Sequence, residues 1–150
     1  MEFDKALLKL QRYCAYQDRC HQEVRSKLLS IKVYGDDLEQ VMSELIRDDY
    51  LNEERFAKSY SRGKFRIKKW GKVKILQGLK ARHISDYCIK KGMAEIEDDE
   101  YRETIKLVLL NQMDRNTHLK PYLAKDKAIK YAISRGFETE IVYEVVKDIS

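Results

Sequence analysis

The sequence predicts an all-α protein built from three tandem three-helix repeats, stacked into an elongated, curved helical array of the right-handed type. Three observations lead to this expectation. The chain has one proline and six glycines in 150 residues, so it favours long helices over sandwiches or barrels. Its apolar residues recur at helical spacing, and one interrupted apolar pattern occurs three times. A chain of this length can also bury a core without disulfides or metals.

The repeated pattern aligns residues 28–45, 79–96 and 132–149 without gaps. Its corresponding apolar positions are Leu28, Leu79 and Ala132; Val33, Ile84 and Phe137; Leu38, Ile89 and Val142; and Leu45, Ile96 and Ile149. A small residue recurs upstream, at Cys20, Gly71 and Ala124. A pattern that holds through a turn at two similar offsets is hard to obtain by chance, so we interpret it as an internal repeat.

Three helices are expected in each repeat, and the repeats are expected to span residues 1–50, 51–96 and 97–150. Acidic residues suited to an opening turn mark the first helices, which begin near Asp4, at Asn52 and near Asp98. Short polar links precede the third helices, at residues 32–35, 82–83 and 134–136. Capping residues mark the third helices, at Asp36, Ser85 and Thr139, and Asp36 with Glu39 resembles a capping box. Pro121 either ends one helix or begins the next.

Basic residues are concentrated in the middle of the chain. The net charge is +5, yet no acidic residue lies between Glu54 and Asp86. The basic residues of this window are Arg55, Lys58, Arg62, Lys64, Arg66, Lys68, Lys69, Lys72, Lys74, Lys80 and Arg82. A solvated helix face usually interleaves glutamates, because i,i+4 ion pairs stabilise it. We therefore favour nucleic acid or another polyanion as the counter-charge, with a solvated face as the alternative.

Within this window, the residues from Asn52 onward predict one helix with two faces. An apolar stripe for the core recurs at helical spacing: Phe56, Tyr60, Gly63 and Ile67. An outward ladder of cations recurs at the same spacing: Lys58, Arg62, Arg66 and Lys69. Phe65 and Trp70 lie among the cations and could stack on exposed bases, although packing is the favoured interpretation for both.

Other functional classes find little support. The longest aliphatic run, Leu107–Leu110, is too short to cross a bilayer, and the acidic start does not fit a signal peptide, so we expect a cytoplasmic protein without a membrane segment. Free thiols are expected at Cys14, Cys20 and Cys88. The acidic residues 97–100 fit a helix start better than a metal site. Since we find no phosphate-binding loop and no nucleophile elbow, we expect no enzymatic activity, no metal, no cofactor and no small-molecule substrate.

Several segments resemble one family of bacterial regulators. The stretch Tyr50–Ala57, which reads Y-L-N-E-E-R-F-A, resembles the signature that joins the first two repeats of RecX regulatory proteins. Trp70 and Gly71, followed by apolar residues at Ile75, Leu79 and Ile84, resemble the second repeat of that family. Residues 19–28 resemble its opening, although Cys20 and Gln22 depart from the usual residues. The resemblance spans nearly the whole chain and is strongest over residues 19–89.

The resemblance implies tandem three-helix repeats that bind the RecA recombinase filament on single-stranded DNA. It further implies inhibition of RecA ATPase, coprotease and strand-exchange activity, by blocking filament extension or by occupying the filament groove. Contact with DNA itself would be weak and indifferent to sequence. Two kinds of protein that do not act on RecA remain as DNA-binding alternatives: a helical DNA-binding module indifferent to sequence, and a helix-turn-helix regulator. A purely protein-binding scaffold is the third alternative.

The candidate site residues follow from the charge pattern and the signature together. The candidate contacts to the filament or to nucleic acid are Lys58, Arg62, Lys64, Arg66, Lys68, Lys69, Lys72, Lys74, Lys80 and Arg82. The candidate structural residues of the signature are Arg55, Phe56, Ala57, Trp70 and Gly71. Among these, Arg55 is expected to pair with Asp48 or Asp49 of the preceding helix, and Phe56 is expected in the core.

Overall fold

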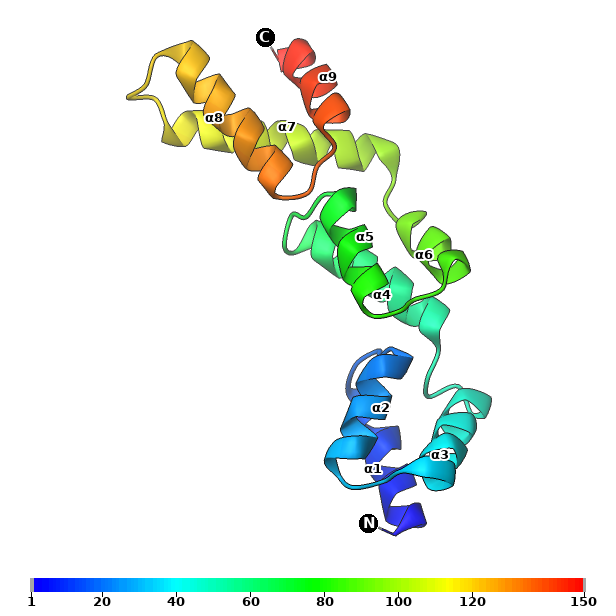
Figure 1. The fold of residues 1–150 in the computed structure, drawn as a ribbon. Coiled ribbons are helices and arrows are strands. Elements are labelled where there is room, and N and C mark those ends of the chain that lie inside the picture. The colour runs from blue at the N-terminus through cyan, green and yellow to red at the C-terminus, as the bar shows by residue number, and fades with distance from the viewer. Residues whose placement is uncertain (1, 150) are drawn as a thin grey trace. The chain divides into compact units, whose positions relative to one another are not determined.

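Helices are the regular elements of this protein. The computed structural model describes residues 2–149, and no strand occurs within that range (Figure 1). The helices are α1 (Phe3–Tyr16), α2 (His21–Ser30), α3 (Gly35–Arg47), α4 (Glu53–Arg66), α5 (Lys72–Ala81), α6 (Asp86–Met93), α7 (Asp98–Arg115), α8 (Pro121–Ser134) and α9 (Thr139–Ile149). The predicted all-α class, with helices in groups of three, is confirmed. Among the described residues, no helix has the length and apolar character needed to cross a membrane.

The chain forms two compact units. One contains the residues up to 59 together with residues 79–92. The other contains residues 60–78 together with those from 93 onward. The repeat boundaries expected at residues 50 and 96 stay a prediction.

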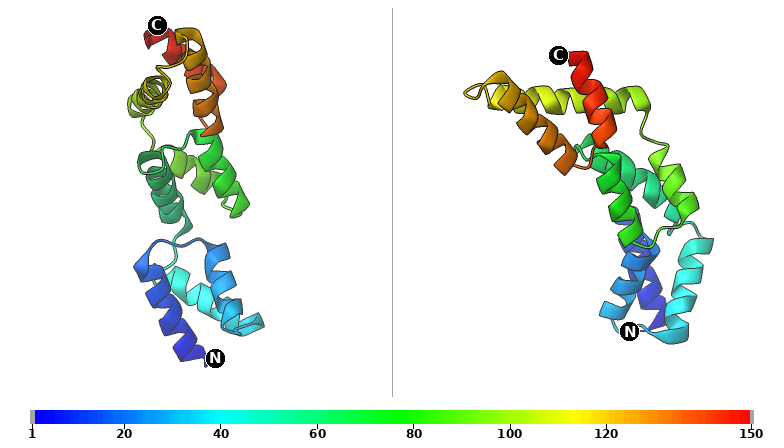
Figure 2. Two further views of the ribbon diagram at one scale, coloured as in Figure 1. Left: turned by 90° about the vertical axis from the view of Figure 1, so that its left-hand side faces the viewer. Right: turned by 45° about the horizontal axis from the view of Figure 1, so that its top comes forward.

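The core of the first unit lies among α1, α2 and α3, which pack on one another (Figures 1 and 2). On α1, the buried residues Ala6, Leu10 and Cys14 recur every four positions and form one inward face. The buried residues of α3 also follow helical spacing: Leu38, Val41, Met42 and Leu45. The apolar periodicity of the sequence therefore produces this core directly.

In the second unit, α7 packs against α8 and α9 (Figures 1 and 2). Tyr101, in the first turn of α7, lies at the centre of this core. The Tyr101 ring is fully buried, with its centre 5.7 Å from that of Phe65 and 5.5 Å from that of Phe137. Its hydroxyl donates to the Glu138 carboxylate and accepts the Lys72 backbone N–H at 2.9 Å. Two effects raise the Tyr101 pKa well above its ordinary value: burial, which is the larger, and the hydrogen bond to Glu138. One side chain thus joins segments from α4, α5 and the loop before α9.

The second helix of each group ends in the same way. A residue with positive φ follows each of these helices: Lys32 (63°), His83 (57°) and Gly136 (97°). The next residue is buried and donates its backbone N–H five positions back: Val33 to Leu28 (3.0 Å), Ile84 to Leu79 (3.2 Å) and Phe137 to Ala132 (3.2 Å). These are corresponding positions of the sequence repeat, so the backbone repeats where the sequence does.

The predicted third-helix caps are corrected at two of three positions. Ser85 does cap α6, because its hydroxyl accepts the Cys88 N–H at 3.2 Å. Asp36 and Thr139 instead lie inside the first turns of α3 and α9. Helix ends are the least certain feature of a periodic pattern. Pro121, whose role the sequence left open, begins α8.

The predicted capping box is also in a different place. The Glu39 carboxylate accepts the Arg25 guanidinium at 3.1 Å instead of capping its own helix. The capping box lies at α2, where the Cys20 N–H donates to the Glu23 carboxylate at 3.2 Å. Sequence spacing alone does not distinguish a cap from an ion pair with a neighbouring helix.

The predicted apolar stripe on α4 is wrong at its C-terminal end. Phe56 is buried as expected, but Ile67 is 79% exposed because α4 ends at Arg66 and the helical spacing no longer applies. Phe65, which the pattern placed among the cations, is 1% exposed. Packing, rather than base stacking, is therefore the role of Phe65.

Candidate functional site

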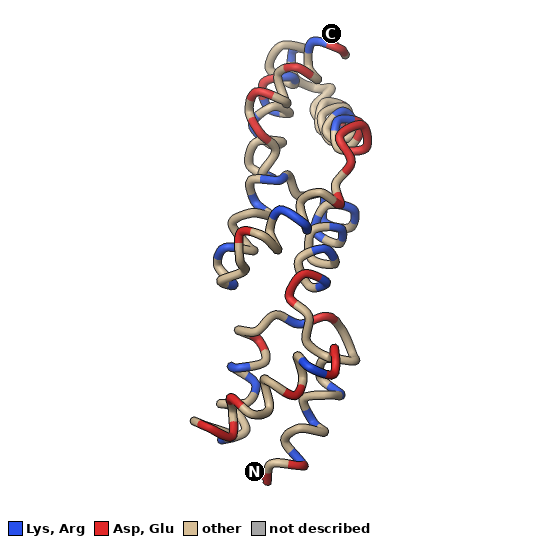
Figure 3. Tube along the Cα trace, turned by 90° about the vertical axis from the view of Figure 1, so that its right-hand side faces the viewer, with Lys and Arg blue, Asp and Glu red and all other residues tan. Residues whose placement is uncertain are grey.

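The eleven basic residues of the acid-free window, from Arg55 to Arg82, form the basic run of the sequence. They lie on α4, in the loop after it and on α5, with Arg82 directly after α5. Figure 3 shows basic positions in successive turns of α4. Three of these cations face a carboxylate. Lys58 Nζ lies 3.2 Å from Glu54 Oε2, Arg62 pairs with Glu95, and Arg66 Nε lies 3.2 Å from Glu100 Oε1. Three of the four members of the predicted outward ladder thus form ion pairs.

The fourth member, Lys69, donates its Nζ to the Arg66 carbonyl oxygen at 2.9 Å. The window in the sequence contains no acidic residue. Glu95 and Glu100 lie beyond it in the sequence, and only folding brings them against α4. Pairs on the surface contribute little stability, so their main effect here is to lower the positive potential of α4.

Two lysine side chains lie close to the Trp70 ring. Lys64 Nζ is 4.8 Å and Lys74 Nζ is 4.5 Å from the centre of the Trp70 ring system. Lysine ammonium groups at such distances are attracted by the negative face of an aromatic ring. Trp70 therefore positions two cations that form no ion pair with any residue the structure describes.

Two lysines of the basic run lie close to arginines that are distant in the sequence. Lys68 and Lys69 line a cleft of about 140 Å³ together with Arg115 and Arg135. The other lining residues are Val108, Asn111, Gln112 and Tyr131, so no carboxylate contributes to the lining. The Arg135 guanidinium also donates to the Lys68 backbone carbonyl oxygen. Sequence reasoning missed Arg115 and Arg135, because each is an isolated cation in a mixed-charge stretch.

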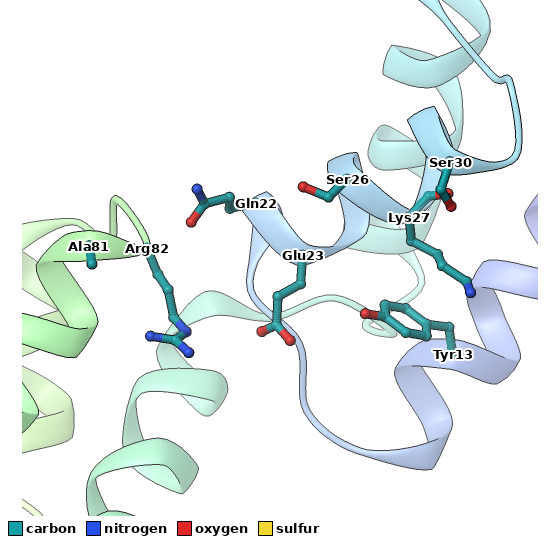
Figure 4. Close-up of a pocket in the computed structure, with 8 residues that line it drawn as sticks. All are labelled: Tyr13, Gln22, Glu23, Ser26, Lys27, Ser30, Ala81 and Arg82. Carbon is teal, nitrogen blue, oxygen red and sulfur yellow. The ribbon is translucent and has the colours of Figure 1, made fainter.

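Three candidates remain. Lys72 belongs to the second unit, where its Nζ lies 4.7 Å from the centre of the Tyr101 ring. Lys80 and Arg82 belong to the first unit. Lys80 is exposed near the end of α5. Arg82 lines a larger cleft of about 530 Å³ with Tyr13, Gln22, Glu23, Ser26, Lys27, Ser30 and Ala81 (Figure 4). Figure 4 shows the carboxylate of Glu23 directed into the same cleft as the Arg82 guanidinium. This cleft has mixed charge and favours an anion less than the one at Lys68.

The side chain of Arg55, in the signature, binds other residues of the protein. Its Nε donates to Asp18 Oδ1 at 2.8 Å and its Nη1 to Asp49 Oδ2 at 3.1 Å. Its Nη2 donates to the carbonyl oxygens of Asp49 and Tyr50, at 3.0 and 3.2 Å. Asp49 is one of the two acids expected from the sequence, whereas Asp18 was not expected. Each of the three guanidinium nitrogens therefore donates to the link before α2 or to the link before α4.

No cluster of three metal-ligating side chains occurs between residues 2 and 149. The three cysteines are free thiols, as the sequence predicts. Burial raises the pKa of both Cys14 and Cys20 to about 11, which disfavours the reactive thiolate. Chemistry at these positions is therefore suppressed by their surroundings.

Sequence comparisons connect this arrangement with known proteins. A family model described as "RecX, second three-helix domain" matches residues 52–93. The chain is 24% identical over 149 residues to the regulatory protein RecX of Bacillus mycoides, covering 99% of this chain and 55% of the relative. It is 27% identical over 132 residues to that of Lactococcus lactis subsp. cremoris strain SK11, covering 86% and 49%. The chain spans about half the length of these curated relatives.

Structural comparisons agree with this result. The crystal structure of RecX from Lactobacillus salivarius superposes with a TM-score of 0.87 at 22% identity, covering 97% of this chain and 95% of that chain. A second crystal structure of a regulatory protein RecX gives a TM-score of 0.84 at 23% identity, covering 97% and 71%. Likeness at this identity establishes the shared fold. Together with the sequence matches, which include the signature around Arg55, it makes this chain similar to the RecX regulatory proteins over nearly its whole length.

Proposed function

We propose that this protein binds the RecA filament on single-stranded DNA and inhibits RecA ATPase, coprotease and strand-exchange activity in the cytoplasm. The similarity of this chain to RecX regulatory proteins supports the choice of RecA as partner. The role would be regulatory, with binding rather than catalysis as its basis and with no cofactor or small-molecule substrate.

The observation that carries the nucleic-acid part of the proposal is the set of lysines around the end of α4. Lys64, Lys68, Lys72 and Lys74 form no ion pair with a residue in the described part of the chain. They lie within the acid-free window of the sequence. Their positive potential suits the phosphate backbone of a DNA-containing filament. The paired arginines Arg62 and Arg66 contribute less to this potential.

The decisive experiment measures ATP hydrolysis by the RecA of the same cell on single-stranded DNA while this protein is titrated in. We expect hydrolysis to fall at protein concentrations at or below that of RecA. Because part of the interaction is with phosphates, the suppression should weaken at the higher of two salt concentrations. Unchanged hydrolysis with the folded protein in excess would rule out the proposed function.

The order of addition separates the two modes of inhibition. If the protein blocks filament extension, adding it to completed filaments should reduce hydrolysis only as filaments lose subunits. If it occupies the groove, the loss should be immediate in both orders. A control without DNA shows whether any effect depends on the filament.

A further inference from the structure

We propose that the cleft between Lys68, Lys69, Arg115 and Arg135 binds the sugar-phosphate backbone of single-stranded DNA, with Tyr131 stacked against a base. This inference rests on the nucleic-acid part of the proposed function. It adds a defined site, most of whose lining comes from α7 and α8 rather than from the basic run.

The charges of the cleft favour an anion. Four cationic side chains line it and no carboxylate does. Arg62 and Arg66 on α4 differ, because Glu95 and Glu100 compete there with any phosphate. The Arg82 cleft differs too, because its lining includes Glu23. Low competition and convergent positive charge together select this cleft over the other cationic surfaces.

The size of the cleft points to part of a chain rather than to a whole small molecule. Its volume of about 140 Å³ is well below the roughly 300–1,000 Å³ of pockets that enclose small ligands. A phosphate group with its neighbouring sugar needs only a shallow, open binding site. The amides of Asn111 and Gln112 supply hydrogen-bond donors beside the cations.

Tyr131 favours a single strand over a duplex. Its side chain lines the cleft and is 40% exposed. An aromatic ring in such a position can stack on a base only if that base is unpaired, and such stacking tolerates any sequence. This agrees with the weak, sequence-indifferent binding that the family resemblance implies.

The cleft is held in shape before any ligand binds. The Arg135 guanidinium fixes the Lys68 carbonyl oxygen, and Lys69 binds the Arg66 carbonyl oxygen in turn. Lys69 adopts a left-handed backbone, with φ 56°, where the chain leaves α4. Preorganisation of this kind lowers the entropic cost of binding.

The test compares two double variants of the full chain that carry the same change in charge. Lys68→Gln with Arg115→Gln removes two exposed cations from the cleft and leaves Arg135 in place. Lys106→Gln with Lys127→Gln removes two exposed cations of α7 and α8 that do not line it. Binding of a fluorescent mixed-sequence DNA 20-mer is followed by anisotropy over a range of salt, and circular dichroism verifies that both variants are folded.

The cleft variant should bind single-stranded DNA about 25-fold more weakly at 0.1 M salt, since release of counterions contributes roughly fivefold per phosphate contact. Its log–log salt slope should be shallower by about 1.4. The control variant should lose much less. Tyr131→Phe should bind as the native protein does, while Tyr131→Leu should bind the single strand more weakly and a duplex with unchanged affinity.

Equal losses in the two double variants would overturn the inference, because net charge alone would explain them. Normal DNA binding by the cleft variant combined with loss of RecA inhibition would also overturn it, since the cleft would then contact protein. The reverse result distinguishes the two proposals. If the cleft binds DNA as described but RecA hydrolysis is unaffected by the native protein, the inference stands and the proposed function fails.

Discussion

The backbone of Gly71 lies directly against the backbone of Gly136. A Cβ atom placed on Gly71 would lie 2.2 Å from the carbonyl carbon of Gly136. The Gly71 N–H donates to the carbonyl oxygen of Arg135 at 2.9 Å, and the Val73 N–H donates to that of Gly136 at 3.0 Å. The first turn of α5 is therefore bound to the chain that leaves α8. Only glycine at position 71 allows this approach.

The substitution Gly71→Ala should destabilise the protein by about 3 kcal/mol, because the added methyl group meets backbone that cannot rotate away. Gly63→Ala is the matched control, since a Cβ there meets nothing within 4 Å. Gly63 lies inside α4, so this control should stabilise the protein by about 0.5–1 kcal/mol. Urea denaturation measures both free energies of unfolding. Equal effects of the two substitutions would contradict the contact between glycines.

Arg55 should act on stability through the geometry of its fork. Arg55→Gln removes the ion pairs to Asp18 and Asp49 and should lower the free energy of unfolding by about 1–3 kcal/mol. Arg55→Lys should recover only part of this loss, because one ammonium group cannot bind both carboxylates and two carbonyl oxygens together. Chemical denaturation of the three proteins tests this. Full recovery by lysine would show that charge alone is sufficient.

The sequence predicted those features that depend on neighbouring residues in the chain. Helical spacing and the repeat together identified the buried residues that follow each second helix, at Val33, Ile84 and Phe137. Glycine occupies the preceding left-handed position only in the third group, while Lys32 and His83 hold it in the others. The repeat of apolar residues was therefore a better indicator of these turns than glycine was.

The features that the sequence did not predict depend on which distant segments meet. Nothing in the acid-free window indicates that Glu95 and Glu100 will lie against Arg62 and Arg66. The sequence did not identify Arg115 as a candidate site residue, because the residues around it carry both positive and negative charges. Periodicity shows which face of a helix is buried, but not which charged side chains border that face from other helices.

The thiols of Cys14 and Cys20 should titrate late and make the protein less stable in alkali. Burial raises both pKa values to about 11, whereas thiols of an unfolded chain ionise near 8.5. As pH rises through this window, the unfolded chain loses protons first, so the free energy of unfolding falls. Thiolate absorbance of a Cys88→Ser variant should show the late titration while circular dichroism remains native. Titration of the folded protein near pH 8.5 would contradict the burial of these groups.

Removing the carboxylates opposite Arg62 and Arg66 should strengthen binding to single-stranded DNA, if α4 lies on the path of the phosphates. The double variant Glu95→Gln with Glu100→Gln leaves both guanidinium groups without their partners. Its log–log salt slope should become steeper by up to about 1.4, while stability falls by about 1 kcal/mol or less for each exposed pair. Glu103→Gln with Glu140→Gln makes the same change in charge at exposed residues of α7 and α9 that form no ion pair with a residue in the described part of the chain. If anisotropy gives the same gain for both double variants, net charge explains it, and the arginines of α4 serve the fold rather than the filament.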